Sequence, residues 1–316
     1  MLARFPIIIG PTAGGKSALA LAVVGELRSR GSAGELISAD AFQVYRGMDI
    51  GTAKPTGTER ARAAHHLIDL VEPTESFTVA QWLRLAEAAI ANIRGRGAMP
   101  IVVGGTHLYG KALLDGLFEG PDPDPVLRAQ LAQMDPAARR EELARVDPAA
   151  AARIHPADDR RTIRALEVYR TTGRPISAWQ RQWDREWSRR TDCVLVILDW
   201  PTEAINRRVN ARVRDMIERG LVEEARGLWE GGRLGPQARE ALGYKQLIGH
   251  FEGGCTLEEA IEQVKIETRR FAKNQRTWIR RLASHPGALR IPIGAEPDAD
   301  LPPGAPAAIA DACLAG

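Results

Sequence analysis

The sequence predicts an α/β fold, a parallel sheet flanked by helices, with a helical insertion domain. Residues 5–9 form a continuous apolar run, which is followed by Gly-Pro-Thr-Ala-Gly-Gly-Lys-Ser at residues 10–17. This spacing of a strand, a glycine-rich turn and a helix start is that of a phosphate loop. Further apolar runs end in polar residues, as parallel strands do at the ligand-binding edge of such sheets. The character of the sequence changes near residue 115, the pattern is helical from 126 to about 190, and an apolar strand then returns at 194–198.

The elements of the first half follow this scheme in order. Short continuous apolar runs are typical of buried parallel strands, and apolar residues at helical spacing indicate helices. Residues 43–54 show neither pattern and carry glycines, so we expect an ordered functional loop there. Strands are expected at 5–9, 35–39 and 100–103, and helices at 17–30 and 79–94.

The second half continues with a strand and long helices. After the strand at 194–198, helices are expected at 203–219, 222–229 and 257–282, with a glycine-rich break at 231–243, a short strand at 289–293 and a weak helix near 305–314. The expected organisation is therefore a phosphate-loop core in two parts, 1–115 and 191–316, around a helical insertion at 116–190.

Composition excludes several classes of protein. A chain of 316 residues is long enough for roughly two domains. Three widely spaced cysteines without a CxxC pair argue against a zinc site or a disulfide framework and fit a reducing compartment. No apolar run approaches the ~20 residues that cross a bilayer, and the chain enters a strand without a signal-peptide layout. We expect a cytoplasmic protein.

The phosphate loop suits two adjacent phosphates. Its glycines let backbone N–H groups point inward, and the following helix offers the positive end of its dipole. Lys16 adds a positive charge, and the Ser17 hydroxyl can hold Mg²⁺. The loop alone does not tell whose phosphates bind.

Two polar residues follow predicted strands at the same edge of the sheet. Asp40 could accept a proton or hold the water shell of a metal, and Thr106, after two glycines, could bond a phosphate or an amine. Each could instead only shape a turn, and the local pattern leaves both possibilities open.

Residues after the insertion offer further candidates. Asp199 resembles the acidic residue that helps to hold Mg²⁺ in phosphate-loop nucleotidases, but a plain strand end is the simpler interpretation. Arg208 and Arg212 share one helix face. They would neutralise a diphosphate if that face overlooks the loop, and otherwise they would be solvated or paired with carboxylates.

Two basic clusters favour a polyanion surface. The insertion contributes Arg153, Arg160, Arg161 and Arg164, and the helix at 257–282 contributes Arg269, Lys273, Arg276 and Arg280. A charge run is usually just a solvated face, but two clusters beside a phosphate-binding core favour nucleic acid. The apolar residues of that same helix, expected to pack inward, are Val264, Phe271, Trp278 and Leu282.

These motifs together resemble the tRNA dimethylallyltransferase family, also called tRNA isopentenyltransferases. The resemblance rests on the phosphate loop, on 37–40, on Gln-Val-Tyr-Arg-Gly-Met-Asp-Ile-Gly-Thr-Ala-Lys-Pro at 43–55 and on Val-Gly-Gly-Thr-His-Leu-Tyr at 103–109. It continues with Ala-Leu-Gly-Tyr-Lys at 241–245 and Ala-Lys-Asn-Gln-Arg-Thr-Trp at 272–278. Ala41 and Asn274 depart from the family pattern, which has Ser and Arg there.

The resemblance implies transfer of a dimethylallyl group from dimethylallyl diphosphate to N6 of adenosine 37 in tRNA, giving N6-isopentenyladenosine and diphosphate. Asp40 would be the general base on N6, and Thr106 would contact the amine or the diphosphate. The implied diphosphate site is Gly10, Thr12, Ala13, Gly14, Gly15, Lys16, Ser17 and Arg212, with Mg²⁺ on Ser17. The implied contacts to the anticodon stem-loop are Asp40, Ala41, Phe42, Gln43, Thr106, Arg128, Arg160, Arg161, Thr162, Ile163, Arg164 and Lys273. A monomer that does not bind membranes is expected.

Three alternatives stay open at this point. The first is a phosphate-loop kinase that uses ATP on a nucleotide or small molecule. The second is an isopentenyltransferase acting on free AMP or ATP, which should lack the insertion. The third is a phosphate-loop module that binds RNA without catalysis.

Overall fold

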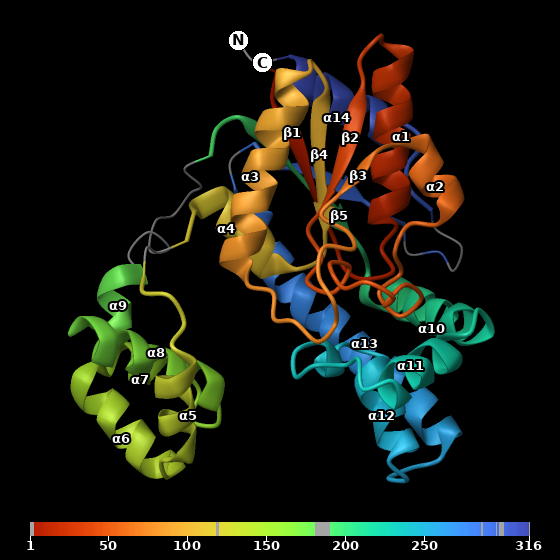
Figure 1. The fold of residues 1–316 in the computed structure, drawn as a ribbon. Coiled ribbons are helices and arrows are strands. Elements are labelled where there is room, and N and C mark those ends of the chain that lie inside the picture. Colours follow the sequence, from red (N-terminus) through yellow and green to blue (C-terminus); the bar gives the residue numbers. More distant parts are fainter. Residues whose placement is uncertain are drawn as a thin grey trace. The chain divides into compact units, whose positions relative to one another are not determined.

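The computed structural model describes residues 3–117, 120–180, 190–285, 287–294, 296 and 300–315. They belong to two compact units (Figure 1). One combines Met1–Leu114 with Arg189–Gly316, and the other is Asp115–Ser188. Residues 181–189 of the predicted insertion lie outside the described residues.

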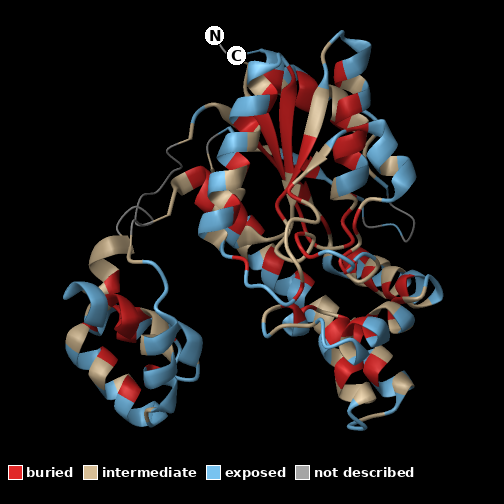
Figure 2. Cartoon of the chain, viewed as in Figure 1, coloured by how far each residue is buried: buried red, intermediate tan, exposed pale blue. Residues whose placement is uncertain are grey.

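The first unit is built on a parallel sheet, as predicted. Its described strands lie in the order β3-β2-β4-β1-β5-β6, and every pair is parallel. All residues of β1 are buried, because both faces of the sheet are covered (Figure 2). The strands are β1 (Phe5–Ile9), β2 (Gly34–Ser38), β3 (His65–His66), β4 (Met99–Gly104), β5 (Cys193–Asp199) and β6 (Leu289–Pro292).

Helices cover the sheet on both sides. The chain leaves β1 for β2 through α1 (Lys16–Ser29) and turns back to β4 through α3 (Val79–Gly95). Right-handed crossovers in opposite directions place these two helices on opposite faces (Figure 1). The last helix, α14 (Ala305–Leu314), packs against α1. Smaller helices of this part are α2 (Gly57–Arg62) and α4 (His107–Asp115).

Four helices lie beyond the carboxyl ends of the strands (Figure 1). They are α10 (Thr202–Glu218), α11 (Leu221–Glu230), α12 (Tyr244–Phe251) and α13 (Leu257–Leu282), with a 3₁₀ turn at Ala238–Glu240. A capping box formed by Thr256 and Glu259 fixes the start of α13. No described helix is both long and apolar enough to cross a membrane.

Sequence analysis did not predict α2, β3, α4 or α12. One expectation about α13 was also wrong. Phe271 was expected to pack inward, but its side chain is 41% exposed, and Trp278 is only half-buried. The buried positions of α13 are Ala260, Val264, Ala272, Gln275 and Ile279. One of them is polar, which an apolar pattern does not reveal.

The second unit is helical throughout its described secondary structure. An Asp-Pro pair starts each of its first three helices, with Asp124, Asp135 and Asp147 as side-chain caps. A separate apolar core, which includes Leu131, Leu143 and Leu166, holds the helices together. They are α5 (Pro125–Gln133), α6 (Pro136–Val146), α7 (Pro148–Arg153), α8 (Asp159–Thr172) and α9 (Ile176–Trp179).

Candidate active site

A cavity of about 480 Å³ opens at the carboxyl edge of the sheet in the first unit. Its walls come from the phosphate loop, the turns after β2 and β4, and helices α10 and α13. The structure thus brings together residues that are far apart in the sequence. The predicted site residues that line it are Thr12, Lys16, Ser17, Asp40, Ala41, Phe42, Gln43, Thr106 and Arg212.

The phosphate loop has the geometry of an anion site. It turns where the Gly14 N–H bonds the Pro11 carbonyl at 3.1 Å, and a Cβ on Gly14 would lie only 2.8 Å from that carbonyl oxygen. Gly10 is also confined, since a Cβ there would lie 3.0 Å from Leu198 Cβ. The loop amides that bond no acceptor in the described part of the chain are those of Ala13, Gly15, Lys16 and Ser17. Such amides are available to a phosphate.

Two cations face this loop. Lys16 Nζ bonds the Pro11 carbonyl at 2.8 Å. Burial and the neighbouring Arg212 lower the pKa of Lys16 to about 8, against the opposing pull of Asp40. Within the described residues, Arg212 makes no hydrogen bond or ion pair, and burial lowers the pKa of its guanidinium as well. An anion bound between Lys16 and Arg212 would stabilise the charged form of both side chains and so offset the effect of burial on their pKa values.

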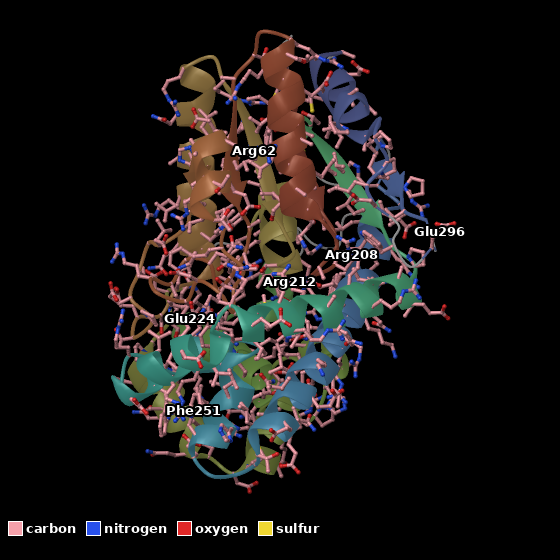
Figure 3. All side chains as sticks on the ribbon, turned by 90° about the vertical axis from the view of Figure 1, so that its right-hand side faces the viewer. Arg62, Arg208, Arg212, Glu224, Phe251 and Glu296 are labelled. Atoms are coloured by element: carbon pink, nitrogen blue, oxygen red, sulfur yellow. The ribbon has the colours of Figure 1, made fainter. Side chains whose placement is uncertain are left out.

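The helix face shared by Arg208 and Arg212 does overlook the loop (Figure 3). Arg208 braces the loop, because its Nε bonds the Ala13 carbonyl at 2.9 Å while its guanidinium stacks 4.8 Å over the Trp200 ring. Trp200 in turn donates to the Gly14 carbonyl at 3.0 Å. Arg212 is left to face the cavity.

Asp199 behaves as a plain strand end. Its carboxylate pairs with Arg290 of β6, and it does not line the cavity. Ser17 is the better candidate metal ligand, since it is exposed in the first turn of α1 and its hydroxyl has no hydrogen-bond partner among the residues described. Among the described residues, no group of three or more His, Cys, Asp or Glu side chains is placed so that it could hold a metal ion. Mg²⁺ fits a serine with phosphates and water, because it usually takes few protein ligands.

The two oxygens of the Asp40 carboxylate have different surroundings. Oδ1 accepts the N–H of Phe42 at 2.9 Å and of Gln43 at 3.3 Å, so it shapes the turn. Oδ2 bonds no described residue and lies in the field of Lys16 and Arg212. The carboxylate is therefore held in place by one oxygen and can accept a proton on the other.

Thr106 lies beside this turn. Its Oγ1 accepts the Ala41 N–H at 3.1 Å, so its hydroxyl proton can still be donated. The two turns approach each other closely, because a Cβ at Gly104 would fall 2.1 Å from the Ala39 carbonyl oxygen. Glycine is required here, and it brings a hydroxyl and a carboxylate to one wall of the cavity.

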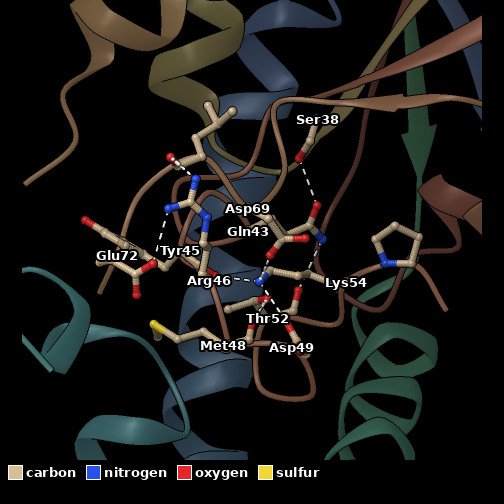
Figure 4. Close-up of polar contacts among 12 residues, drawn as sticks. Ser38, Gln43, Tyr45, Arg46, Met48, Asp49, Thr52, Lys54, Asp69 and Glu72 are labelled. Atoms are coloured by element: carbon tan, nitrogen blue, oxygen red, sulfur yellow. Dashed lines mark hydrogen bonds and ion pairs between the residues drawn. The ribbon is translucent and has the colours of Figure 1, made fainter. Parts of the chain in front are cut away.

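The segment 43–54 is ordered by buried polar contacts (Figure 4). Lys54 is almost fully buried and bonds the Tyr45 carbonyl at 2.5 Å, Asp49 at 2.7 Å and Asp69 at 2.5 Å. Gln43 accepts from Ser38 and donates to the carbonyls of residues 52 and 53. Both ends of the Gln43 amide are thus engaged within the protein.

Glu224 of α11 is a structural residue that sequence reasoning missed. Its carboxylate accepts three successive backbone N–H groups, at 2.9 Å from Asp49, 2.8 Å from Ile50 and 3.1 Å from Gly51. It also accepts the Tyr244 hydroxyl, whose ring would lie 2.4 Å from a Cβ at Gly51. The only signal in the sequence was Tyr244, within the motif at 241–245.

We expect Glu224→Ala to lower the free energy of unfolding by about 1–3 kcal/mol, because charge-assisted hydrogen bonds to the loop are lost. Urea unfolding measures it. Glu223→Ala is the matched control, since Glu223 is exposed and should change stability by less than about 0.5 kcal/mol. Equal effects of the two variants would contradict the role of Glu224.

In the second unit, two of the predicted tRNA contacts are engaged in an ion-pair cluster. Glu167 is fully buried and accepts from Arg128 at 2.8 Å and from Arg164 at 2.5 Å. Burial alone would raise the pKa of Glu167, but the two arginines outweigh it and hold that pKa below its usual value. Thr162 is buried, Ile163 is half-buried, and Arg160 and Arg161 are exposed.

The basic residues of α13 also differ in their surroundings. Arg269 bonds Asn210 at 2.6 Å, and Arg276 bonds Thr202. Lys273 is exposed, and its side chain pairs with nothing in the part of the chain that the structure describes. Phe271 lines the cavity while staying partly exposed, so an aromatic ring stands at its wall.

Known proteins are similar to this chain in sequence over most of its length. The tRNA dimethylallyltransferases of Geobacillus thermodenitrificans and Anaeromyxobacter dehalogenans are 45% and 47% identical to it. The alignments cover 89% and 88% of this chain and 88% and 92% of those proteins.

Solved structures agree with the sequence relatives. A tRNA isopentenylpyrophosphate transferase from Bacillus halodurans is 38% identical, covers 92% of this chain and 90% of its own, and gives a TM-score of 0.65. A eukaryotic dimethylallyltransferase, described as acting on tRNA, is 28% identical, with 92% and 74% covered and a TM-score of 0.77. The family model described as IPP transferase matches residues 43–282. This chain therefore belongs to the IPP transferase family, whose members include the tRNA dimethylallyltransferases.

Proposed function

We propose that this chain transfers a dimethylallyl group from dimethylallyl diphosphate to N6 of adenosine 37 in the anticodon loop of tRNA. One observation carries the proposal: the amides of the phosphate loop, Lys16 and Arg212 share a cavity with the Asp40 carboxylate. The first group suits an anionic leaving group, and the carboxylate suits the removal of a proton. A kinase would also use the loop, but the relatives do not favour that alternative.

The chain's own residues account for the chemistry. An amine conjugated to a purine ring is a weak nucleophile, so its attack on the allylic carbon is helped if Asp40 Oδ2 accepts the proton. The new bond joins N6 to C1 of the dimethylallyl group, and the bond from C1 to the diphosphate oxygen breaks. The Thr106 hydroxyl can form a hydrogen bond with the reacting amine or with the diphosphate, and so orient whichever group it contacts.

The leaving diphosphate gains negative charge as the bond breaks. Preorganised donors at that position stabilise the transition state more than the bound substrate, and the loop amides, Lys16 and Arg212 supply them. Mg²⁺ on the Ser17 hydroxyl would neutralise part of this charge when it is bound. The apolar part of the cavity wall, which includes Val209, Val213 and Met216, suits a hydrocarbon group.

We propose contacts to tRNA in each unit separately. Asp40, Ala41, Phe42 and Thr106 stand at the cavity, and Lys273 and the exposed Arg160 and Arg161 offer charges for the RNA backbone. The target base has to leave the loop's stack to enter a cavity of this kind. We propose a monomer, and a cytoplasmic location because its substrate is tRNA.

One assay tests the function. Labelled dimethylallyl diphosphate is incubated with the protein, unmodified tRNA, Mg²⁺ and AMP as a competing acceptor. We expect label in tRNA at the position beside the anticodon and none in AMP. No label in tRNA, or equal label in AMP, would overturn the proposal. A parallel reaction with labelled ATP in place of labelled dimethylallyl diphosphate tests the kinase alternative, which phosphate transfer from ATP to an acceptor would support.

The pH dependence follows from Lys16. Its pKa of about 8 means that the ammonium is charged below that pH and neutral above it. Since only the charged form attracts diphosphate, kcat/KM for dimethylallyl diphosphate should fall as the pH rises through about 8. Profiles at saturating tRNA measure it. Lys16→Arg should move the fall to higher pH, and an unchanged fall in that variant would assign it to another group.

A further inference from the structure

Gln275 is a buried polar residue on a helix whose other buried positions are apolar or alanine. Its side chain is 3% exposed. The side-chain Oε1 accepts the Thr12 N–H at 2.8 Å, and Nε2 donates to the Gly105 carbonyl at 2.7 Å. Both ends of one amide are therefore engaged, and they join the phosphate loop to the turn that carries Thr106.

The space around this amide is tight. A Cβ at Gly105 would lie 2.6 Å from Gln275 Nε2 and 3.5 Å from Lys16 Nζ. The Gln275 amide and the Lys16 ammonium therefore both lie close to Gly105, which leaves no room for a side chain at that position.

The two connected loops carry the two halves of the proposed reaction. The phosphate loop holds the leaving group, whereas the turn at Gly105 is followed by Thr106, which bonds the turn of Asp40 through the Ala41 N–H. The distance between leaving group and nucleophile thus depends on how far apart these loops are held. Small changes in this distance matter for catalysis, since a displacement of about 1 Å can lower the rate about 100-fold.

Resting on the proposed function, we propose that Gln275 is a positioning residue that sets the spacing between the diphosphate site and the Asp40–Thr106 pair. Gln275 lines the cavity, but both ends of its amide are hydrogen-bonded to the protein. Glutamine suits the role because it accepts at one end and donates at the other, which a carboxylate cannot do. Gln275 lies on α13 near the cavity-lining Phe271 and Asn274. The helix that we expect to contact tRNA therefore also holds the two loops at their distance from each other.

Two substitutions separate this role from plain stability. Gln275→Met keeps the length and the apolar stem but removes both hydrogen bonds. We expect kcat to fall by about 10- to 100-fold, with the KM for dimethylallyl diphosphate and the affinity for inorganic diphosphate changed less than about threefold. Gln275→Glu keeps an acceptor for Thr12 and adds a negative charge beside Lys16, so it should weaken diphosphate binding as well.

The control is Thr277→Ala, an exposed position on the same helix, which should keep the kcat of the unsubstituted protein. Thermal unfolding and the fraction of active sites are measured for each variant. A Gln275→Met protein with unchanged kcat, or with a loss equal to its loss of folded protein, would overturn the positioning role. Failure of the unsubstituted protein to label tRNA would instead overturn the proposed function, so the two failures are distinct.

Discussion

Asp40→Asn should slow the transfer of the dimethylallyl group to tRNA by about 10²- to 10⁴-fold, the usual worth of a general base. Asparagine keeps an oxygen that can accept the N–H groups of Phe42 and Gln43, so the turn should survive. It cannot take a proton from N6. Single-turnover transfer of label measures the rate, and filter binding measures the affinity for tRNA, which should stay within about threefold.

Asp40→Ala distinguishes the two roles that this carboxylate combines. If proton transfer is what Asp40 supplies, alanine and asparagine should slow the reaction to a similar extent. If capping the turn is its main role, asparagine should stay close to the unsubstituted protein and only alanine should fail. The second outcome, or a loss of tRNA binding with residual transfer, would contradict the assignment of Asp40 as base.

The framework of the fold could be predicted because its signals are local. Strands such as β1 and β5 are short continuous apolar runs, and the residues that end them mark the ligand-binding edge. The elements that were missed carry weak local signals. β3 consists of only two histidines. α12 begins directly after Gly243, which has a φ of 93° and is the last residue of a glycine-rich stretch. Tertiary packing decides such elements.

The candidate site was predictable only in part for a related reason. Lys16, Asp40 and Thr106 stand at positions that a strand and a turn determine locally. The contacts that hold them join distant segments: Gln275 bonds Thr12 across 263 residues, and Glu224 bonds Gly51 across 173. A single sequence carries no sign of such pairs. Nor could the sequence show that Arg208 bonds the phosphate loop whereas Arg212 faces the cavity.

That last distinction leads to a second large effect. Arg212→Gln should lower the rate of transfer by about 10²- to 10³-fold, because a donor aimed at developing charge is lost. The affinity for inorganic diphosphate should fall by about 10- to 100-fold, the usual worth of charge-assisted hydrogen bonds. Transfer assays and calorimetric titration with diphosphate measure the two effects.

The stability of the same variant separates binding from folding. Within the described chain Arg212 has no hydrogen-bond or ion-pair partner, so glutamine breaks no such contact and removes a half-buried charge. We expect an unfolding temperature equal to or above that of the unsubstituted protein. Arg214→Gln, at an exposed position of the same helix, is the matched control and should change neither activity nor affinity. If Arg212→Gln bound diphosphate as tightly as this control, the arginine would have no part in the anion site. If Arg212 is held in place to bind an incoming anion, Arg212→Gln should lose diphosphate affinity and activity while it keeps its stability, and Arg214→Gln should lose neither.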